Sequence, residues 1–248
     1  MKPIKITAEQ KQGHRKGGFG IEVLYPGLVL GQNDTGIGAI GRIDHAHVSP
    51  GTVVPMHPHR DDEILSYMRE GRMVHTDTVG NKEELTNLRM MMMNAGHSFQ
   101  HEERMAGSEP IKMLQIFLRP RAKDLEPRVQ FHDFETKRSE NVWRLLAAPE
   151  GEAPLEVRAD VWVHDASLRS GEKLALPSAK GKQVTRIIYA FSGTVSVGTE
   201  IVLTEGESLI VQGSDYEVVA RDDSDIVLFT TDKTAPVFKG GMFSGNMA

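Results

Sequence analysis

Short apolar runs separated by turn residues recur along the whole chain, and stretches with helical periodicity are scarce. Such runs are typical of β-strands, because a strand buries either alternate side chains or a brief continuous apolar segment. Several runs are followed at once by glycine or proline, as at Glu70-Gly71, Arg119-Pro120 and Gln212-Gly213. The pattern predicts an all-β protein with few short helices, packed as sandwiches or jelly rolls.

Residues 119–128 divide the chain, because this segment is charged, contains two prolines and lacks apolar periodicity. The two sides echo each other: YMREGRMV (67–74) and YAFSGTVSV (189–197) each combine an aromatic strand, a glycine turn and a returning strand. This weak duplication predicts two similar barrels, over residues 1–128 and 129–248. The glycine-rich residues after about Val237 are expected to form a loosely packed tail.

The overall composition excludes several classes of function. The 248 residues carry a net charge of −5, which argues against direct binding to nucleic acid or to an anionic membrane and leaves a protein partner open. The chain has no cysteine, so disulfides, thiolate nucleophiles and Fe–S clusters are excluded. Neither a signal-peptide core nor a membrane-spanning run is present, and a cytoplasmic location is the default expectation.

Histidine is concentrated in the first half, where eight of the ten lie within the first 101 residues. His57 and His59 are two residues apart, so on a strand they point to the same face. His101 and Glu103 form a second pair with the same spacing. Two such pairs on neighbouring strands would give three imidazoles and one carboxylate, a set that suits Fe, Mn, Ni, Co, Cu or Zn.

These residues carry a specific resemblance. The segment Gly51 to Gly71 resembles the first cupin motif, and within it PMHPHRDDEI (55–64) looks like the signature of the pirin family. Ala95-Gly96, followed by His101 and Glu103, is similar to that family's second motif. LQIFLRP (114–120) resembles the strand that follows it in pirins. The resemblance is close over residues 37–120, whereas residues 18–30 lack the usual pirin signature and Asn94 replaces the proline of the general second cupin motif.

The resemblance implies a bicupin of two jelly-roll barrels with one divalent metal ion, Fe(II) first, held in the N-terminal barrel by His57, His59, His101 and Glu103. Glu63 of the first motif is the alternative carboxylate ligand, and otherwise an outer hydrogen-bond acceptor or a pocket-lining group. The implied activity is that of a quercetin 2,3-dioxygenase, which opens a flavonol or related enol with O2. Glu103 would be both metal ligand and catalytic base.

Two other functions remain open. Pirins of eukaryotes associate with transcription factors, so the chain could be a redox-sensitive, metal-binding regulatory protein that acts through a protein partner. A metal-assisted isomerase or lyase acting on a sugar acid would need a cationic anchor, for which strand alternation favours Arg69 over Arg60.

The remaining residues of note have plainer interpretations. The C-terminal half has Pro177 and Ser178 about where histidines would stand, so we expect no metal there and a structural role. His45 and His47 are expected on an exposed strand face or a pocket rim. The run Met90 to Met93 is expected to fill a barrel wall, with Met90 and Met92 on one face and Met91 and Met93 on the other.

Overall fold

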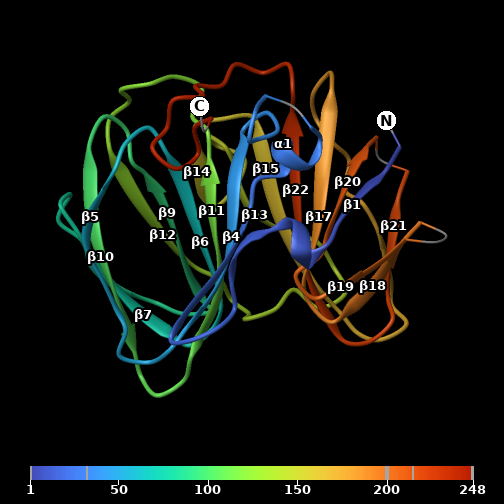
Figure 1. The fold of residues 1–248 in the computed structure, drawn as a ribbon, viewed down its shortest axis with the longest axis horizontal. Helices are drawn as coiled ribbons and strands as arrows, with labels where there is room; N and C mark the ends of the chain where they lie inside the picture. The colour runs from blue at the N-terminus through green and yellow to red at the C-terminus, as the bar shows by residue number, and fades with distance from the viewer. Residues whose placement is uncertain (1, 32, 199–200, 214, 247–248) are drawn as a thin grey trace.

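In the computed structural model, which describes residues 2–31, 33–198, 201–213 and 215–246, the chain forms two β-barrels side by side (Figure 1). Over these residues, each barrel combines one seven-stranded and one four-stranded sheet. The N-terminal barrel has the strand orders β12-β9-β6-β11-β4-β3-β2 and β5-β10-β7-β8. The C-terminal barrel has the orders β1-β20-β17-β22-β15-β13-β14 and β16-β21-β18-β19. The predicted all-β, two-barrel fold is confirmed.

The strands of the N-terminal barrel are β2 Gln12–His14, β3 Phe19–Leu24, β4 Ile40–Val48, β5 Val53–His59, β6 Glu63–Glu70, β7 Arg72–Asp77, β8 Lys82–Leu85, β9 Arg89–Asn94, β10 Phe99–Ala106, β11 Ile111–Leu118 and β12 Arg128–Asp133. Those of the C-terminal barrel are β1 Ile4–Ile6, β13 Arg144–Pro149, β14 Leu155–Val157, β15 Val161–Leu168, β16 Lys173–Ala175, β17 Val184–Ser192, β18 Thr194–Val197, β19 Ile201–Thr204, β20 Ser208–Gln212, β21 Glu217–Ala220 and β22 Ser224–Asp232. The short helices are the 3₁₀ turn Ala8–Gln10 and α1 Pro26–Val29. No helix in the described ranges is long and apolar enough to span a bilayer.

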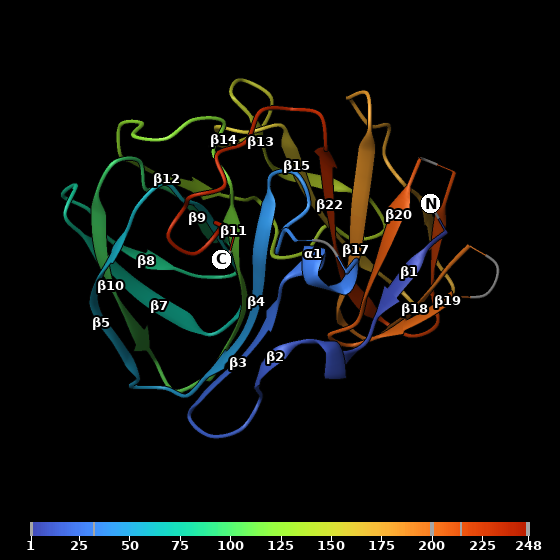
Figure 2. The ribbon, with the colours of Figure 1, turned by 45° about the horizontal axis from the view of Figure 1, so that its top comes forward.

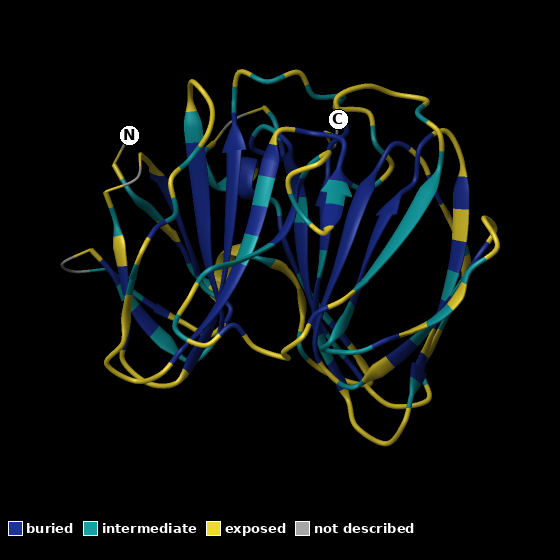
Figure 3. Ribbon diagram, turned by 180° about the vertical axis from the view of Figure 1, so that it is seen from behind, coloured by how far each residue is buried: buried dark blue, intermediate teal, exposed yellow. Residues whose placement is uncertain are grey.

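The two large sheets face each other in the middle of the molecule, and the small sheets close the outer sides (Figures 1 and 2). Three apolar clusters follow from this layout: one inside each barrel and a third between the large sheets. Buried positions accordingly concentrate on the central strands, whereas exposed ones lie mainly in the loops and on the outer strands (Figure 3). The barrels thus share a core.

The methionine run confirms the predicted alternation. Met90 and Met92 belong to the cluster between the barrels, and Met91 and Met93 to the cluster inside the N-terminal barrel. All four side chains are buried. A flexible thioether side chain fills irregular space, so one strand can serve two cores at once.

Each terminal segment packs on the barrel that the other half of the chain forms. β1 pairs with β20 on the C-terminal barrel, and the segment after β22 crosses back to the N-terminal barrel (Figures 1 and 2). The expectation of a loosely packed tail is wrong for residues 238–246, because Ser244 is buried and both Phe243 N–H and Ser244 N–H donate to Asp62. Residues 247 and 248 of that tail lie outside the described residues. The domain division at residue 128 stays a prediction.

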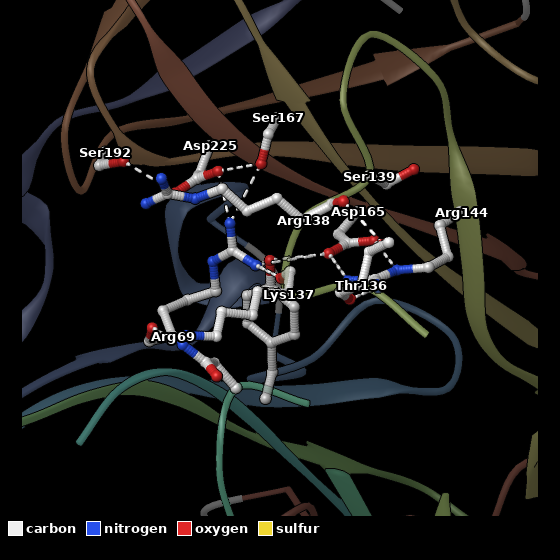
Figure 4. A network of polar contacts seen from close by, with 12 residues as sticks. Arg69, Thr136, Lys137, Arg138, Ser139, Arg144, Asp165, Ser167, Ser192 and Asp225 are labelled. Carbon is white, nitrogen blue, oxygen red and sulfur yellow. Dashed lines mark hydrogen bonds and ion pairs between the residues drawn. The ribbon is translucent and has the colours of Figure 1, made fainter. Parts of the chain in front are cut away.

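A buried polar network also joins the barrels (Figure 4). The guanidinium of Arg69 on β6 donates to Asp225 of β22 at 2.5 Å and to Ser167 of β15 at 3.1 Å. Its other terminal nitrogen donates to the carbonyl of Lys137 at 2.8 Å. Strand alternation favoured Arg69 as a substrate anchor beside the histidines, and this expectation is wrong. Arg69 instead links one barrel to the other. Arg60 is exposed.

Candidate metal centre

β5 and β10 are antiparallel neighbours, and in their register His57 lies opposite His101 while His59 lies opposite Phe99. Opposed residues, and residues two apart on one strand, share a face of the sheet. Phe99 belongs to the core of the N-terminal barrel, so this face is the inner one. The three imidazoles are therefore directed inward from two adjacent strands.

The side-chain geometry brings these imidazoles together. Potential ligand atoms of His57, His59 and His101 all lie within 4.8 Å of one another. The Nε2 atoms of His59 and His101 are 3.0 Å apart. Nδ1 of His57 bonds to the carbonyl of Pro55 at 2.8 Å, and since a carbonyl only accepts, this nitrogen carries the proton. Nε2 of His57 then has its lone pair free, as a metal ligand requires.

Glu103 lies on the other side of His101. Its carboxylate is 3.6 Å from Nδ1 of His101 and accepts a hydrogen bond from Gln115 Nε2 at 3.3 Å. It forms a second close group with His101 and His75, not with His57 and His59. A bulge in the β5–β10 pairing falls between His101 and Glu103. His101 therefore lies opposite His57, whereas Glu103 lies opposite Val54.

His75 is a further residue of this region. It lies on β7 directly opposite Glu103, is buried, and bonds through Nε2 to Asp77 at 2.8 Å. The alternation in β7 carried the signal, since Met73, His75 and Asp77 form its buried face. A buried histidine on such a face lines the barrel interior.

Burial sets the protonation of the group. It raises the pKa of Glu103 to about 7, and the hydrogen bond from Gln115 offsets this only in part. Burial, followed by the neighbouring imidazoles of His59 and His57, lowers the pKa of His101 to about 2. Burial also lowers the pKa of His57. At neutral pH His57 and His101 are therefore uncharged and have lone pairs available.

Glu63 lies elsewhere. Its buried carboxylate accepts hydrogen bonds from the backbone N–H of Arg158 at 3.0 Å and from Arg158 Nε at 2.8 Å, and it also bonds Asn94. These contacts join the N-terminal barrel to the loop before β15. Glu63 belongs to neither close group of potential ligands among the described residues.

His45 and His47 also lie away from this centre. Nδ1 of His45 is 3.0 Å from the hydroxyl of Tyr189 on β17, and the His45 ring stacks on Phe191 at 4.7 Å. The expected exposed strand face or pocket rim is wrong for His45, which is buried between the barrels. In the described part of the chain, neither residue joins a group of three potential ligands.

The donor set fits a divalent transition metal. Among the described residues, the Nε2 atoms of His59 and His101 bond only each other, and the buried Nδ1 atom of each ring has no hydrogen bond, although it lies 3.6 Å from the carboxylate of Asp62 or Glu103. Buried polar atoms normally find partners, so adjacent imidazoles with unsatisfied nitrogens favour an absent ligand. Imidazole nitrogens are the donors that Fe, Ni, Cu and Zn share.

Aromatic side chains cover the centre. The rings of Phe117 and Phe243 lie 6.0 Å and 4.9 Å from that of His59, measured between centroids. His57 is only half-buried, whereas His59 and His101 are fully buried. The centre therefore has an apolar wall, formed partly by the C-terminal segment, and an approach from the side of His57.

Comparisons with known proteins agree with this architecture. The pirin family model matches residues 32–118. The quercetin 2,3-dioxygenase of Escherichia coli K12 is 26% identical over 199 residues, which cover 79% of this chain and 84% of that protein. Human pirin is 31% identical over 182 residues, covering 65% of this chain and 62% of human pirin. 

Among solved structures, the bacterial pirin YhhW of Escherichia coli in complex with nickel(II) superposes with a TM-score of 0.80 at 22% identity, over 93% of this chain and 99% of that one. A quercetin 2,3-dioxygenase from Acinetobacter baumannii gives a TM-score of 0.75 at 19% identity, over 92% of this chain and 85% of its own. The matched family model and these relatives support membership of the pirin family, and the solved structures show the same fold.

Proposed function

We propose that this protein is a metal-dependent dioxygenase of the quercetinase type, which cleaves a flavonol-like or enol substrate with O2. One divalent ion, Fe(II) first, would be held by His57, His59, His101 and Glu103. The observation that carries the proposal is the convergence of His57, His59 and His101 beside a buried carboxyl group whose pKa is raised to about 7. Relatives named quercetin 2,3-dioxygenase and a relative with bound nickel(II) support the same chemistry.

The metal, when bound, supplies Lewis-acid and electron-transfer chemistry for the reaction with O2. The protein residues supply orientation. The Pro55 carbonyl fixes the ring of His57, and burial keeps His101 neutral, so both offer nitrogen lone pairs in a set geometry. Glu103, whose carboxylate is 3.6 Å from Nδ1 of His101, would supply the fourth ligand.

Glu103 is also the proposed proton acceptor. An enol substrate must lose its hydroxyl proton, and a general base works best when its pKa is near the working pH. In the metal-free site burial raises the pKa of Glu103 to about 7; a bound cation would lower it, and the support for Glu103 as proton acceptor is its buried position beside His101. The apolar wall of Phe117 and Phe243 excludes water from the reacting oxygen atoms.

Elemental analysis of protein purified without added metal, followed by oxygen uptake with quercetin, tests the proposal. We expect about one metal ion per chain, and we expect His101→Ala to lose most of the metal and the oxygen uptake. His97→Ala is the matched control, because His97 is an exposed histidine just before β10. Full metal content in His101→Ala would refute the metal assignment. Metal-loaded wild type that consumes no O2 with flavonols, catechols or enediols would refute the activity.

A further inference from the structure

The C-terminal barrel contains a cavity of about 330 Å³. Its lining includes Pro177 and Ser178, the two residues that stand where the first barrel has its histidines. Trp162 and Thr230, neighbours across β15 and β22, form part of its wall. The second barrel is therefore hollow near the place that its metal site would occupy.

A buried arginine adjoins this cavity. Arg186 on β17 lies opposite Thr230 in the sheet and is fully buried. Opposed residues share a face, so its side chain points into the barrel, toward the wall that Thr230 lines. Its Nη2 donates to the carbonyl of Pro177 at 2.5 Å. The guanidinium thus contacts the lining at Pro177 from inside the barrel; Arg186 is not itself a lining residue, so a ligand would meet it by displacing this contact.

Arg186 lacks the counter-charge that other buried arginines have. Arg69 is paired with Asp225, Arg119 with Asp34 and Arg158 with Glu63. Among the described residues, Arg186 pairs with no carboxylate, and its Nε and Nη1 have no hydrogen-bond partner. A guanidinium stays charged even when buried, so an unpaired one in an apolar barrel is strongly unfavourable. An anion in the cavity would remove that penalty.

The surroundings of Arg186 favour a small monocarboxylate. Nδ1 of His164, which also lines the cavity, is buried without a partner. Burial, followed by the charge of Arg186, lowers the pKa of His164 to about 4, so this imidazole offers a hydrogen bond without a second positive charge. Leu145 and Trp162 offer apolar surface, and Glu152 and Lys180 of the lining pair with each other at 2.7 Å, which leaves Arg186 as the unpaired charge beside the cavity.

We propose that the C-terminal barrel binds a small carboxylate of about benzoate size, with its carboxylate on Arg186 and its apolar body against Trp162 and Leu145. Guanidinium and carboxylate form charge-assisted hydrogen bonds, among the strongest available in proteins. This site is separate from the histidines of the first barrel and does not depend on the proposed oxygenase activity.

Benzoate is the probe for a titration calorimetry experiment on the full chain. The protein is His57→Ala, stripped with chelator, so that the candidate metal centre cannot contribute. We expect saturable binding of one benzoate per chain and a melting temperature that rises with benzoate concentration. Arg186→Gln should weaken binding at least tenfold, whereas Arg221→Gln, which alters an exposed arginine of the same barrel, should leave it unchanged.

A second variant guards against misfolding of Arg186→Gln. Trp162 is only half-buried, so Trp162→Ala should fold and weaken benzoate binding about fivefold or more. Neutral benzamide should bind at least tenfold more weakly than benzoate. The proposal fails if benzoate does not saturate the stripped protein, if folded Arg186→Gln binds it as wild type does, or if inorganic phosphate binds and benzoate does not.

Discussion

Glu63 and Glu103 are both buried carboxylates, and the groups that contact them indicate different roles. Glu63 is paired with the cationic Arg158, whereas Glu103 has the neutral amide of Gln115 and the rings of His75 and His101. Burial raises the pKa of both carboxyls; the guanidinium of Arg158 offsets this for Glu63, whereas only the amide of Gln115 offsets it for Glu103. Sequence spacing alone left the choice between them open, because both follow a histidine motif.

The first prediction concerns Glu103 in metal-free protein. Its folded pKa of about 7 lies above the ordinary value of 4.5 for a glutamate, so the folded state binds more protons than the unfolded state between these pH values. The free energy of unfolding therefore falls as pH rises through this window, by an amount on the order of 3 kcal/mol from this group. Glu103→Gln should lack that decrease in urea unfolding followed from pH 4 to pH 8.

The matched control is Glu102→Gln on the same strand, whose side chain is less buried and pairs with Arg104. It should retain the wild-type dependence on pH. If Glu103→Gln and wild type lose stability in parallel as pH rises, Glu103 is not the buried neutral carboxyl that the structure describes.

At the scale of the strand, periodicity predicted which residues share a face but not which strand lies alongside. The spacing of His57 and His59 and of His101 and Glu103 placed each pair on one side of a strand, and the structure puts β5 beside β10. The bulge between His101 and Glu103 and the approach of His75 from β7 depend on strand pairing. Strand pairing is a long-range property that a single sequence does not display.

The C-terminal segment is the element for which sequence reasoning failed most clearly. Glycine-rich composition is typical of loose ends, yet here the glycines permit close packing: a Cβ on Gly241 would lie 2.4 Å from the Asp61 carbonyl oxygen. Two backbone N–H groups then donate to Asp62, and Arg119 Nε donates to the Ser244 carbonyl at 2.8 Å. Nothing in the local pattern indicated those distant partners.

The second prediction is that this segment slows metal release. Phe243→Ala removes an aromatic ring from beside His59 and Phe117. It should destabilise the protein by about 1–3 kcal/mol, less than a fully buried phenylalanine because Phe243 is partly exposed. It should also raise the rate at which a chelator strips the metal, measured by a colorimetric chelator under stopped flow. Met242→Ala, at an exposed neighbour, should change neither quantity; an unchanged stripping rate in Phe243→Ala would contradict a covering role.

At the scale of the whole molecule, the sequence predicted two barrels but not how they are joined. The echo between residues 67–74 and 189–197 indicated a duplication, and each segment runs from a strand of a facing large sheet, β6 or β17, into a strand of an outer small sheet, β7 or β18. The joint itself consists of a shared apolar cluster, the exchanged chain ends and the network around Arg69. Each of these features brings together residues that are far apart in the chain, so the local sequence pattern does not indicate the contacts between the barrels. A shared core of this extent predicts that the two barrels unfold as one cooperative unit.

The last prediction tests that unit through Arg69 and Asp225. Arg69→Met leaves Asp225 buried with fewer partners, although Arg138 and Ser167 still contact it. Removing one member of a buried pair costs about 3–5 kcal/mol, and the remaining partners should bring the loss to about 2–4 kcal/mol. Arg69→Met/Asp225→Asn should lose less than the sum of the single variants, with a coupling energy of about 0.5–3 kcal/mol in a double-mutant cycle. Arg72→Met, which breaks the exposed pair with Glu84, should cost less than about 1 kcal/mol.

Hydrogen exchange should report the same free energy of opening for the most protected amides of both barrels, because neither can open without exposing the shared cluster. Two separate unfolding transitions, or additive losses in the cycle, would show that the barrels are independent bodies and that the Arg69 network does not couple them.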